Sequence, residues 1–321
     1  MAGGGLPLPA LFHPPTPIVR GVGLLDLTRR ERMWSFLLVA PALAVVVLLF
    51  VYPLIFSVIT AFGTETCKFN KFDKIISGFA APNCDVTLAN LFKAWDFYKV
   101  DVAYTVIIAV LSTALIGIIS LAIGGYLTLG ENPRAVAVLR WLYRWPLFIP
   151  FIVAAQLMRT FLAKNGMMNN IFVSMGFFDA FDAQSFLDWR GIIATFVWKQ
   201  TPFVALLVSG AMAALDRSTF EAARNLGAGR VRILVEIVTP QILQTLVVGL
   251  ILSFVIMLSV LSVPLMINAQ QRTMITVDMQ HQVNYFGDYG VANALGIISY
   301  VMTAAVAVIY LRMSVREQAQ R

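Results

Sequence analysis

The feature that most constrains this 321-residue chain is a series of long apolar segments separated by polar ones. The apolar segments lie at 33–62, 102–129, 145–162, 191–215, 241–267 and 291–311. A helix needs about 20 mainly apolar residues to cross the hydrocarbon core of a bilayer. Only helices and closed barrels satisfy all their backbone groups there. The pattern therefore predicts an all-α polytopic membrane protein with six transmembrane helices.

The composition supports a membrane protein. Hydrophobic residues make up 59% of the chain and charged residues 13%, against about 25% charged residues in soluble proteins. The net charge of +7 is best explained by membrane topology, so no nucleic-acid partner is expected. The first apolar run is too long, and begins too far from residue 1, for a cleavable signal peptide.

Six spans place both ends of the chain on one side of the membrane. That side carries 14 lysines and arginines, against 8 on the other. Because cytoplasmic loops are enriched in basic residues, the termini and the stretch 216–240 are expected in the cytoplasm. The expected parts are a cytoplasmic segment at 1–32, a first transmembrane helix at 33–62, a periplasmic loop at 63–101, a five-helix core at 102–312 and a cytoplasmic tail at 313–321.

The connecting segments carry further expectations. We expect a short basic turn at 130–144, an interfacial helix within 163–189 and, at 268–290, a loop too polar to cross lipid. Prolines are expected to kink the first span, to mark the start of the third and to allow a break in the fifth. Three glycines of the second span should permit close contact between helices: Gly117, Gly124 and Gly125.

The stretch 216–240 is the polar interruption between the fourth and fifth spans. It holds four arginines and three acidic residues. Ser218 can cap a helix, and Glu221 follows it at capping-box spacing. Apolar residues recur at helical spacing on both sides of Gly227. The stretch therefore predicts a short helix, a glycine turn and a second short helix that ends at Pro240.

This stretch resembles the EAA loop of permease subunits of binding-protein-dependent ABC importers. Glu221-Ala222-Ala223 is followed at the family's spacing by Gly227, Ile237 and Pro240. Thr239 stands where the family prefers leucine. The similarity extends over residues 100–312, and the segment before the loop resembles the corresponding helix of sugar permeases.

The resemblance implies a permease subunit in the bacterial inner membrane. Such subunits work with a second permease subunit, two ATPases that bind ATP-Mg, and a periplasmic or lipid-anchored solute-binding protein. The loop would be the cytoplasmic coupling helix that docks into an ATPase. The residues implied in ATPase coupling are Glu221, Ala222, Ala223, Arg224, Gly227, Arg230, Ile237 and Pro240.

Enzymatic chemistry finds little support in the sequence. The chain lacks a phosphate-binding G-x-x-x-x-G-K-[ST] loop, so ATP hydrolysis is assigned to a partner. Its two histidines, His13 and His281, lie far apart in sequence, and no metal-ligand pattern accompanies them. We expect no catalytic residue, no metal and no cofactor in this chain.

Polar side chains inside the spans are the candidates for a substrate pathway, because polar groups in lipid usually face a bundle interior or water. They are Gln156, Arg159, Trp198, Lys199, Gln200, Ser259 and Asn268. The alternatives are that Arg159 and Lys199 extend to a membrane boundary and that the serine packs between helices. Trp198 could stack on a sugar ring or simply pack.

The loop 63–101 contains both cysteines, Cys67 and Cys84. In an oxidising compartment they could form a disulfide, and two free thiols are the alternative.

The sequence leaves the transported solute open. The fourth span resembles that of sugar permeases, which favours a carbohydrate or polyol. The amino-acid sequence of the loop is closer to that of polyamine permeases, so a polyamine or another small polar solute is the alternative. An ion-coupled secondary transporter is the other class considered. The lack of acidic residues within the spans speaks against it.

Overall fold

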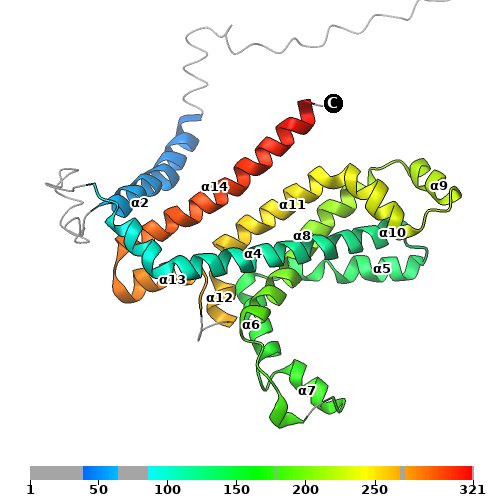
Figure 1. Ribbon diagram of the computed structural model, residues 1–321, viewed down its shortest axis with the longest axis horizontal. Helices are drawn as coiled ribbons and strands as arrows, with labels where there is room; N and C mark the ends of the chain where they lie inside the picture. Colours follow the sequence, from blue (N-terminus) through cyan, green and yellow to red (C-terminus); the bar gives the residue numbers. More distant parts are fainter. Residues whose placement is uncertain (1–38, 64–85, 178, 268–271, 320–321) are drawn as a thin grey trace, which may run out of the picture. The chain divides into compact units, whose positions relative to one another are not determined.

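The computed structural model describes residues 39–63, 86–177, 179–267 and 272–319 (Figure 1). Five helices in these ranges are long and apolar enough to cross a membrane: Val39–Phe62, Ala89–Leu129, Trp189–Ala213, Arg230–Ser259 and Tyr289–Val308. The count reaches six if the bent pair Pro133–Phe148 and Phe151–Ser174 forms one broken span. The predicted all-helical fold with six spans is confirmed in this form.

The chain divides into two units after Phe56. In the first unit, the π-helical segment η1 (Val47–Val51) precedes Pro53 within the first span. The Tyr52 N–H donates to the Val47 carbonyl, five residues back. This wider turn keeps the chain helical next to a proline that has no N–H to give. The predicted segment 1–32 and both cysteines lie outside the described residues.

The second unit is built around α4 (Ala89–Leu129), α8 (Trp189–Ala213) and α11 (Thr239–Ser259), which pack against one another (Figure 1). The glycines of α4 permit this contact. A Cβ added at Gly124 would lie 2.9 Å from Val208 Cγ1, and one at Gly125 would lie 2.7 Å from Leu234 Cδ2. The expected role of these glycines is therefore confirmed.

The predicted loop 63–101 is too long, because α4 already begins at Ala89. The charged residues at the start of α4 are compatible with a helix because they lie on its exposed side. Lys99 pairs with Asp96, and Lys93 pairs with Asp288 at 3.0 Å. Apolar residues between them pack on α2 (Tyr52–Phe62) and α14 (Tyr289–Ala319). Helical periodicity, rather than mean hydropathy, was the signal here.

The predicted basic turn at 130–144 is wrong, since most of it forms α5 (Pro133–Leu142). The Asn132 side chain caps this helix by accepting from the N–H groups of Arg134 and Ala135. Proline at the first helical position fits the same start, because that N–H would be unpaired in any helix.

The third span, expected as one helix over 145–162, is broken. The 3-10 turn η3 (Trp145–Phe148) is followed by extended backbone at Ile149, and α6 (Phe151–Leu162) starts in a new direction after Pro150. The helices on either side differ in direction by 109°. Pro150 has no N–H and disfavours helix at the residue before it.

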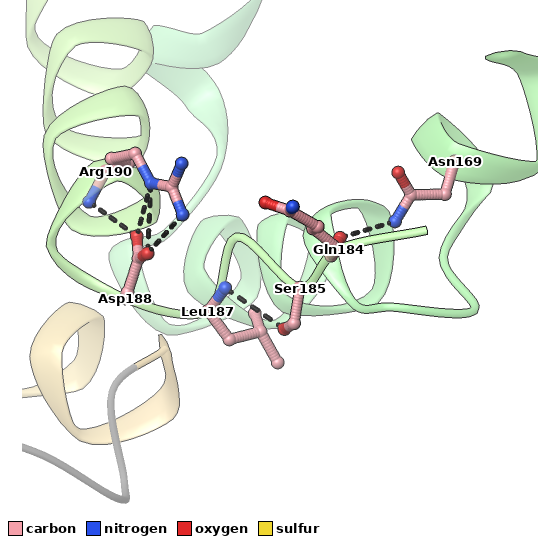
Figure 2. A network of polar contacts seen from close by, with 6 residues as sticks. All are labelled: Asn169, Gln184, Ser185, Leu187, Asp188 and Arg190. Atoms are coloured by element: carbon pink, nitrogen blue, oxygen red, sulfur yellow. Dashed lines mark hydrogen bonds and ion pairs between the residues drawn. The ribbon is translucent and has the colours of Figure 1, made fainter. Parts of the chain in front are cut away.

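The segment after α6 contains a short helix, α7 (Met167–Ser174), and the turn η4 (Ala180–Asp182). Asn169 holds this segment together, with 2% of its surface exposed. Its amide nitrogen lies 2.8–3.1 Å from the carbonyls of Ala163, Lys164 and Gln184. Figure 2 shows this amide directed at Gln184, and nearby the Arg190 guanidinium on Asp188, which caps α8.

Replacing Asn169 with alanine is expected to loosen residues 163–188. The change leaves backbone carbonyls without their buried donor, at a cost of about 1–3 kcal/mol. Limited proteolysis of the purified protein should then cut this segment faster than in the wild type. Asn170→Ala is the matched control, because Asn170 is exposed. Equal cleavage rates in the two variants would contradict the role given to Asn169.

The fifth span ends in a break that the sequence anticipated. α11 stops at Ser259, Val260 is extended, and α12 (Ser262–Ile267) follows with Pro264 inside it. Pro264 cannot donate to the Val260 carbonyl as a helical residue would. The Thr276 hydroxyl donates to that carbonyl instead, at 3.3 Å.

Thr276 belongs to α13 (Ile275–His281), which continues into η6 (Gln282–Phe286) and, after Gly287, into α14. The polar stretch 268–290 is thus partly a buried helix that packs on α4, α11 and α14. It is not among the helices that qualify as spans. The last span belongs to a longer helix than expected, since α14 runs to Ala319.

Candidate functional site

The polar stretch between the fourth and fifth spans begins with α9 (Arg217–Asn225). Its N-cap is Asp216, whose Oδ1 accepts from the Ser218 N–H at 2.9 Å. The expected capping box of Ser218 and Glu221 is therefore wrong. An aspartate placed just before the helix satisfies one of the free N–H groups at its start, that of Ser218.

Gly227 makes the turn after α9. Its φ of +81° lies in the left-handed region that side chains disfavour. The N–H of Ala228 donates to the Ala223 carbonyl at 3.0 Å and that of Gly227 to the Arg224 carbonyl at 2.9 Å. These bonds close the C-terminus of α9, so the predicted helix–Gly–helix geometry is present.

The second helix does not end at Pro240 as predicted. α10 (Arg230–Arg232) continues through the π-helical segment η5 (Ile233–Val238) into α11, as one helix from Arg230 to Ser259. The N–H and the hydroxyl of Thr239 both donate to the Leu234 carbonyl. The wide turn accommodates the following proline, as η1 does before Pro53. Thr239, which replaces the leucine that the family prefers, therefore supplies two hydrogen bonds at this turn.

α9 has one buried and one exposed side. Phe220 and Ala223 are 7% and 8% exposed and belong to the main core cluster. Glu221 and Ala222 are exposed. Among the residues that the structure describes, Glu221 lies in no ion pair. The helix is anchored by Phe220 and presents Glu221 outward.

Two arginines tie the loop to the end of α4. Arg224 donates to the Leu129 carbonyl at 3.3 Å, and Arg230 forms a salt bridge with Glu131. Further along the loop, Ile237 packs half-buried on the main core cluster, and Pro240 is exposed. The loop is therefore fixed to its own chain at several points.

Lys199, which was predicted to line the substrate pathway, is buried in contact with η3. It is 6% exposed, and its Nζ donates to the carbonyls of Pro146 and Leu147 at 2.8 and 3.2 Å. It also lies 5.1 Å from the centre of the Phe151 ring. These carbonyls belong to η3, where the third span breaks. Lys199 thus joins α8 to the break.

The other pathway candidates are spread over several helices. Gln200, next to Lys199, is 4% exposed, and its Nε2 has no hydrogen-bond partner within the described residues. Trp198 is half-buried, whereas Gln156 and Arg159 are exposed on α6. Ser259 is exposed at the end of α11 and donates to the Val255 carbonyl. Asn268 lies outside the described residues.

One buried carboxylate, Asp278 of α13, was not among the residues predicted from the sequence, and it is 5% exposed. Its Oδ1 accepts from the Thr273 hydroxyl at 2.6 Å, and its Oδ2 has no partner in the described part of the chain. Burial raises the pKa of Asp278 to about 6, the Thr273 hydrogen bond opposes this, and the charge of Asp101 on α4 adds to it. Arg272 also lies near Asp101. Asp278 is buried because α13 packs on α4, α11 and α14, and this packing could not be read from the sequence.

Asp278 is expected to make stability depend on pH. Because its pKa is higher in the folded protein, its contribution is fully present below about pH 4 and is lost as the pH rises through about 6. Lowering the pH from 7.5 to 5 should stabilise the wild type by about 1 kcal/mol through this group. Thermal unfolding of wild type and Asp278→Asn at both pH values tests this. The same pH response in both proteins would contradict it.

Comparisons with known proteins agree with one another. Residues 120–316 match the family model described as "binding-protein-dependent transport system inner membrane component". The sulfoquinovosyl glycerol transport system permease protein SmoG of Agrobacterium fabrum is 24% identical over 88% of this chain and 91% of its own. The trehalose/maltose permease protein MalF of Thermococcus litoralis is 25% identical over 88% and 94%.

A solved structure has the same fold. It is a chain in the crystal structure of a bacterial alginate ABC transporter in complex with an alginate pentasaccharide-bound periplasmic protein. The TM-score is 0.63 at 20% identity, over 89% of this chain and 96% of the other.

Proposed function

Because this chain belongs to the family of binding-protein-dependent transport system inner membrane components, we propose that it carries a carbohydrate or polyol through the membrane. The chain is a multi-pass permease subunit of an ABC importer and has a transport role rather than an enzymatic one. The family match, over more than half of the chain, carries this conclusion. It also removes the ion-coupled carrier that the sequence left as an alternative class.

The nature of the solute is proposed from the relatives. Two permeases that align with most of this chain are named for sulfoquinovosyl glycerol and for trehalose and maltose. Their solutes are carbohydrates, which favours a carbohydrate or polyol over a polyamine here. Within the chain, the buried amide nitrogen of Gln200, which has no hydrogen-bond partner among the described residues, is suited to a hydroxyl-rich solute. Trp198 beside it offers an aromatic surface.

The loop Asp216–Pro240 is proposed as the site where an ATPase docks. α9 offers Glu221 on its exposed side while Phe220 anchors the helix in the core. The second loop helix is continuous with the fifth span. A displacement of the loop would therefore reach the span directly, without an intervening flexible link. ATP binding would draw the ATPases together and turn the spans between inward-open and outward-open forms.

The proposed assembly contains a second permease subunit, two ATPases that bind ATP-Mg and an extracytoplasmic solute-binding protein. This chain itself would bind no ATP. The excess of basic residues at the ends and in the loop supports a cytoplasmic position for both termini and for α9. The bacterial inner membrane is the proposed location.

The test is uptake by the purified assembly in proteoliposomes with its binding protein outside and ATP inside. We expect labelled mono- or oligosaccharides, screened first on the binding protein, to enter only with ATP and to be unaffected by an uncoupler. ATP-driven uptake of polyamines, without uptake of any carbohydrate or polyol, would overturn the proposed solute. Uptake without ATP that collapses with the ion gradient would overturn the proposed mechanism.

A further inference from the structure

A cavity of about 360 Å³ lies at the end of the bundle that carries the loop. Its walls come from the C-terminal ends of α4 and α8, from α5 and from α9 (Figure 1). Its apolar lining includes Leu127, Leu206 and Phe220. Two arginines, Arg140 and Arg144, line it as well. The cavity thus combines apolar and basic side chains.

The two arginines are available to a ligand. Arg140 belongs to α5 and Arg144 lies two residues beyond its end, and both line the cavity. Both are exposed, and neither has a carboxylate within ion-pair distance among the described residues. The Arg144 guanidinium contacts Tyr143, whose hydroxyl accepts from Arg144 Nε at 3.2 Å and whose ring centre lies 5.6 Å from Arg144 Cζ. By contrast, Arg224 and Arg230 of the neighbouring loop are bound to groups of their own chain.

We propose that this cavity binds the phosphate headgroup of an anionic glycerophospholipid. Two guanidiniums in one cavity suit a phosphate, which accepts several charge-assisted hydrogen bonds. The apolar lining residues suit the first part of an acyl chain, which a free phosphate does not have. Basic pockets between helices at the cytoplasmic side of a membrane commonly bind such headgroups. The choice of leaflet rests on the proposed orientation.

The site also bears on the loop. Phe220 both lines the cavity and anchors α9, so a lipid held there would pack against the anchor of the proposed coupling helix. Binding of the lipid itself does not depend on transport. Its test therefore gives an answer even if the proposed function fails.

The test is lipid retention by the full chain, purified from nanodiscs that contain phosphatidylglycerol and phosphatidylcholine, with native mass spectrometry as the readout. The wild type should keep phosphatidylglycerol selectively. The double variant Arg140→Gln/Arg144→Gln should lose this preference by roughly 30-fold, as expected for two arginines near an anionic lipid surface. Arg134→Gln is the matched control, because Arg134 is an exposed arginine of α5 that does not line the cavity.

A second variant tests whether the space within the cavity is needed. Gly210 lines the cavity, and a Cβ added there would meet nothing within 4 Å. Gly210→Leu should fill the space without a clash, and leucine favours helix more than glycine does. It should therefore keep the thermal stability of the wild type and lose the lipid.

Each outcome decides the proposal. Selective retention that is lost in the double variant and in Gly210→Leu, but kept in Arg134→Gln, supports it. Equal retention in the double variant and the wild type overturns it. The proposal also fails if the wild type keeps no phosphatidylglycerol selectively but binds inorganic phosphate in phosphatidylcholine-only nanodiscs. The cavity would then be a site for small anions.

Discussion

Glu221→Lys is expected to abolish ATP-driven uptake while the subunit stays folded. Glu221 is exposed on α9 and contributes to no ion pair in the described part of the chain, so its reversal removes no internal contact. If an ATPase docks on this face, the reversed charge should oppose docking, and we expect uptake to fall roughly 30-fold or more. Uptake in proteoliposomes and co-purification of the ATPase measure the effect.

Glu236→Lys is the matched control for this change. Glu236 is an exposed glutamate of the same loop, paired with Arg232 at 2.8 Å on the second helix. Loss of an exposed pair of this kind costs about 0.3–0.5 kcal/mol. Uptake should stay near the wild-type level. An equal loss in both variants would indicate a general charge effect and not docking through α9.

Gly227→Ala tests the geometry of the loop separately from its charge. A Cβ at Gly227 would meet nothing within 4 Å, so the change acts only through the positive φ. The backbone strain is about 1–2 kcal/mol. We expect a folded subunit whose α9 is displaced and whose uptake falls. Near-normal uptake would show that the angle between the two loop helices does not matter.

Lys199→Met is expected to impair both stability and transport. The change removes the Lys199 ammonium from the Pro146 and Leu147 carbonyls at the break of the third span. The Pro146 carbonyl keeps the Ile149 N–H as a donor, whereas the Leu147 carbonyl has no other donor among the described residues. One unpaired carbonyl costs about 1–3 kcal/mol, and relief from burying an ammonium offsets part of this. We expect a net loss of about 1 kcal/mol in thermal unfolding, and at least a tenfold loss of uptake.

Two further variants identify the cause. Lys199→Arg keeps donors at this position and should recover part of the stability. Lys164→Met removes an exposed lysine between α6 and α7 and should behave as the wild type. If Lys199→Met unfolds at the wild-type temperature, then Lys199 does not hold the break, and a role in contact with the solute would gain support.

The sequence by itself determined the class of this protein. Apolar segments of membrane-spanning length predict helices because lipid offers no partner for backbone N–H and C=O groups. The glycine turn was also visible, because only glycine adopts φ of +81° at Gly227 without strain. The spacing of the motif that begins at Glu221 indicated the family, because such a motif is a local pattern that can be read from the sequence.

Only the tertiary structure decided what the polar side chains do. Lys199 and Arg159 look alike in the sequence, as single charges inside apolar segments. The structure buries Lys199 against the carbonyls at the break and leaves Arg159 exposed. Arg140 and Arg144 acquire a common cavity only when α4, α5, α8 and α9 come together.

The prolines are visible in the sequence, but only the structure shows whether a helix breaks or continues at each of them. Pro150 ends a helix, whereas Pro240 does not, although both lack an N–H group. At Pro240 a wide π turn and the Thr239 hydroxyl supply what the proline cannot. Two carbonyls at the break before Pro150 accept from a side chain of another helix, Lys199. Such partners lie far away in sequence, and so the local pattern could not reveal them.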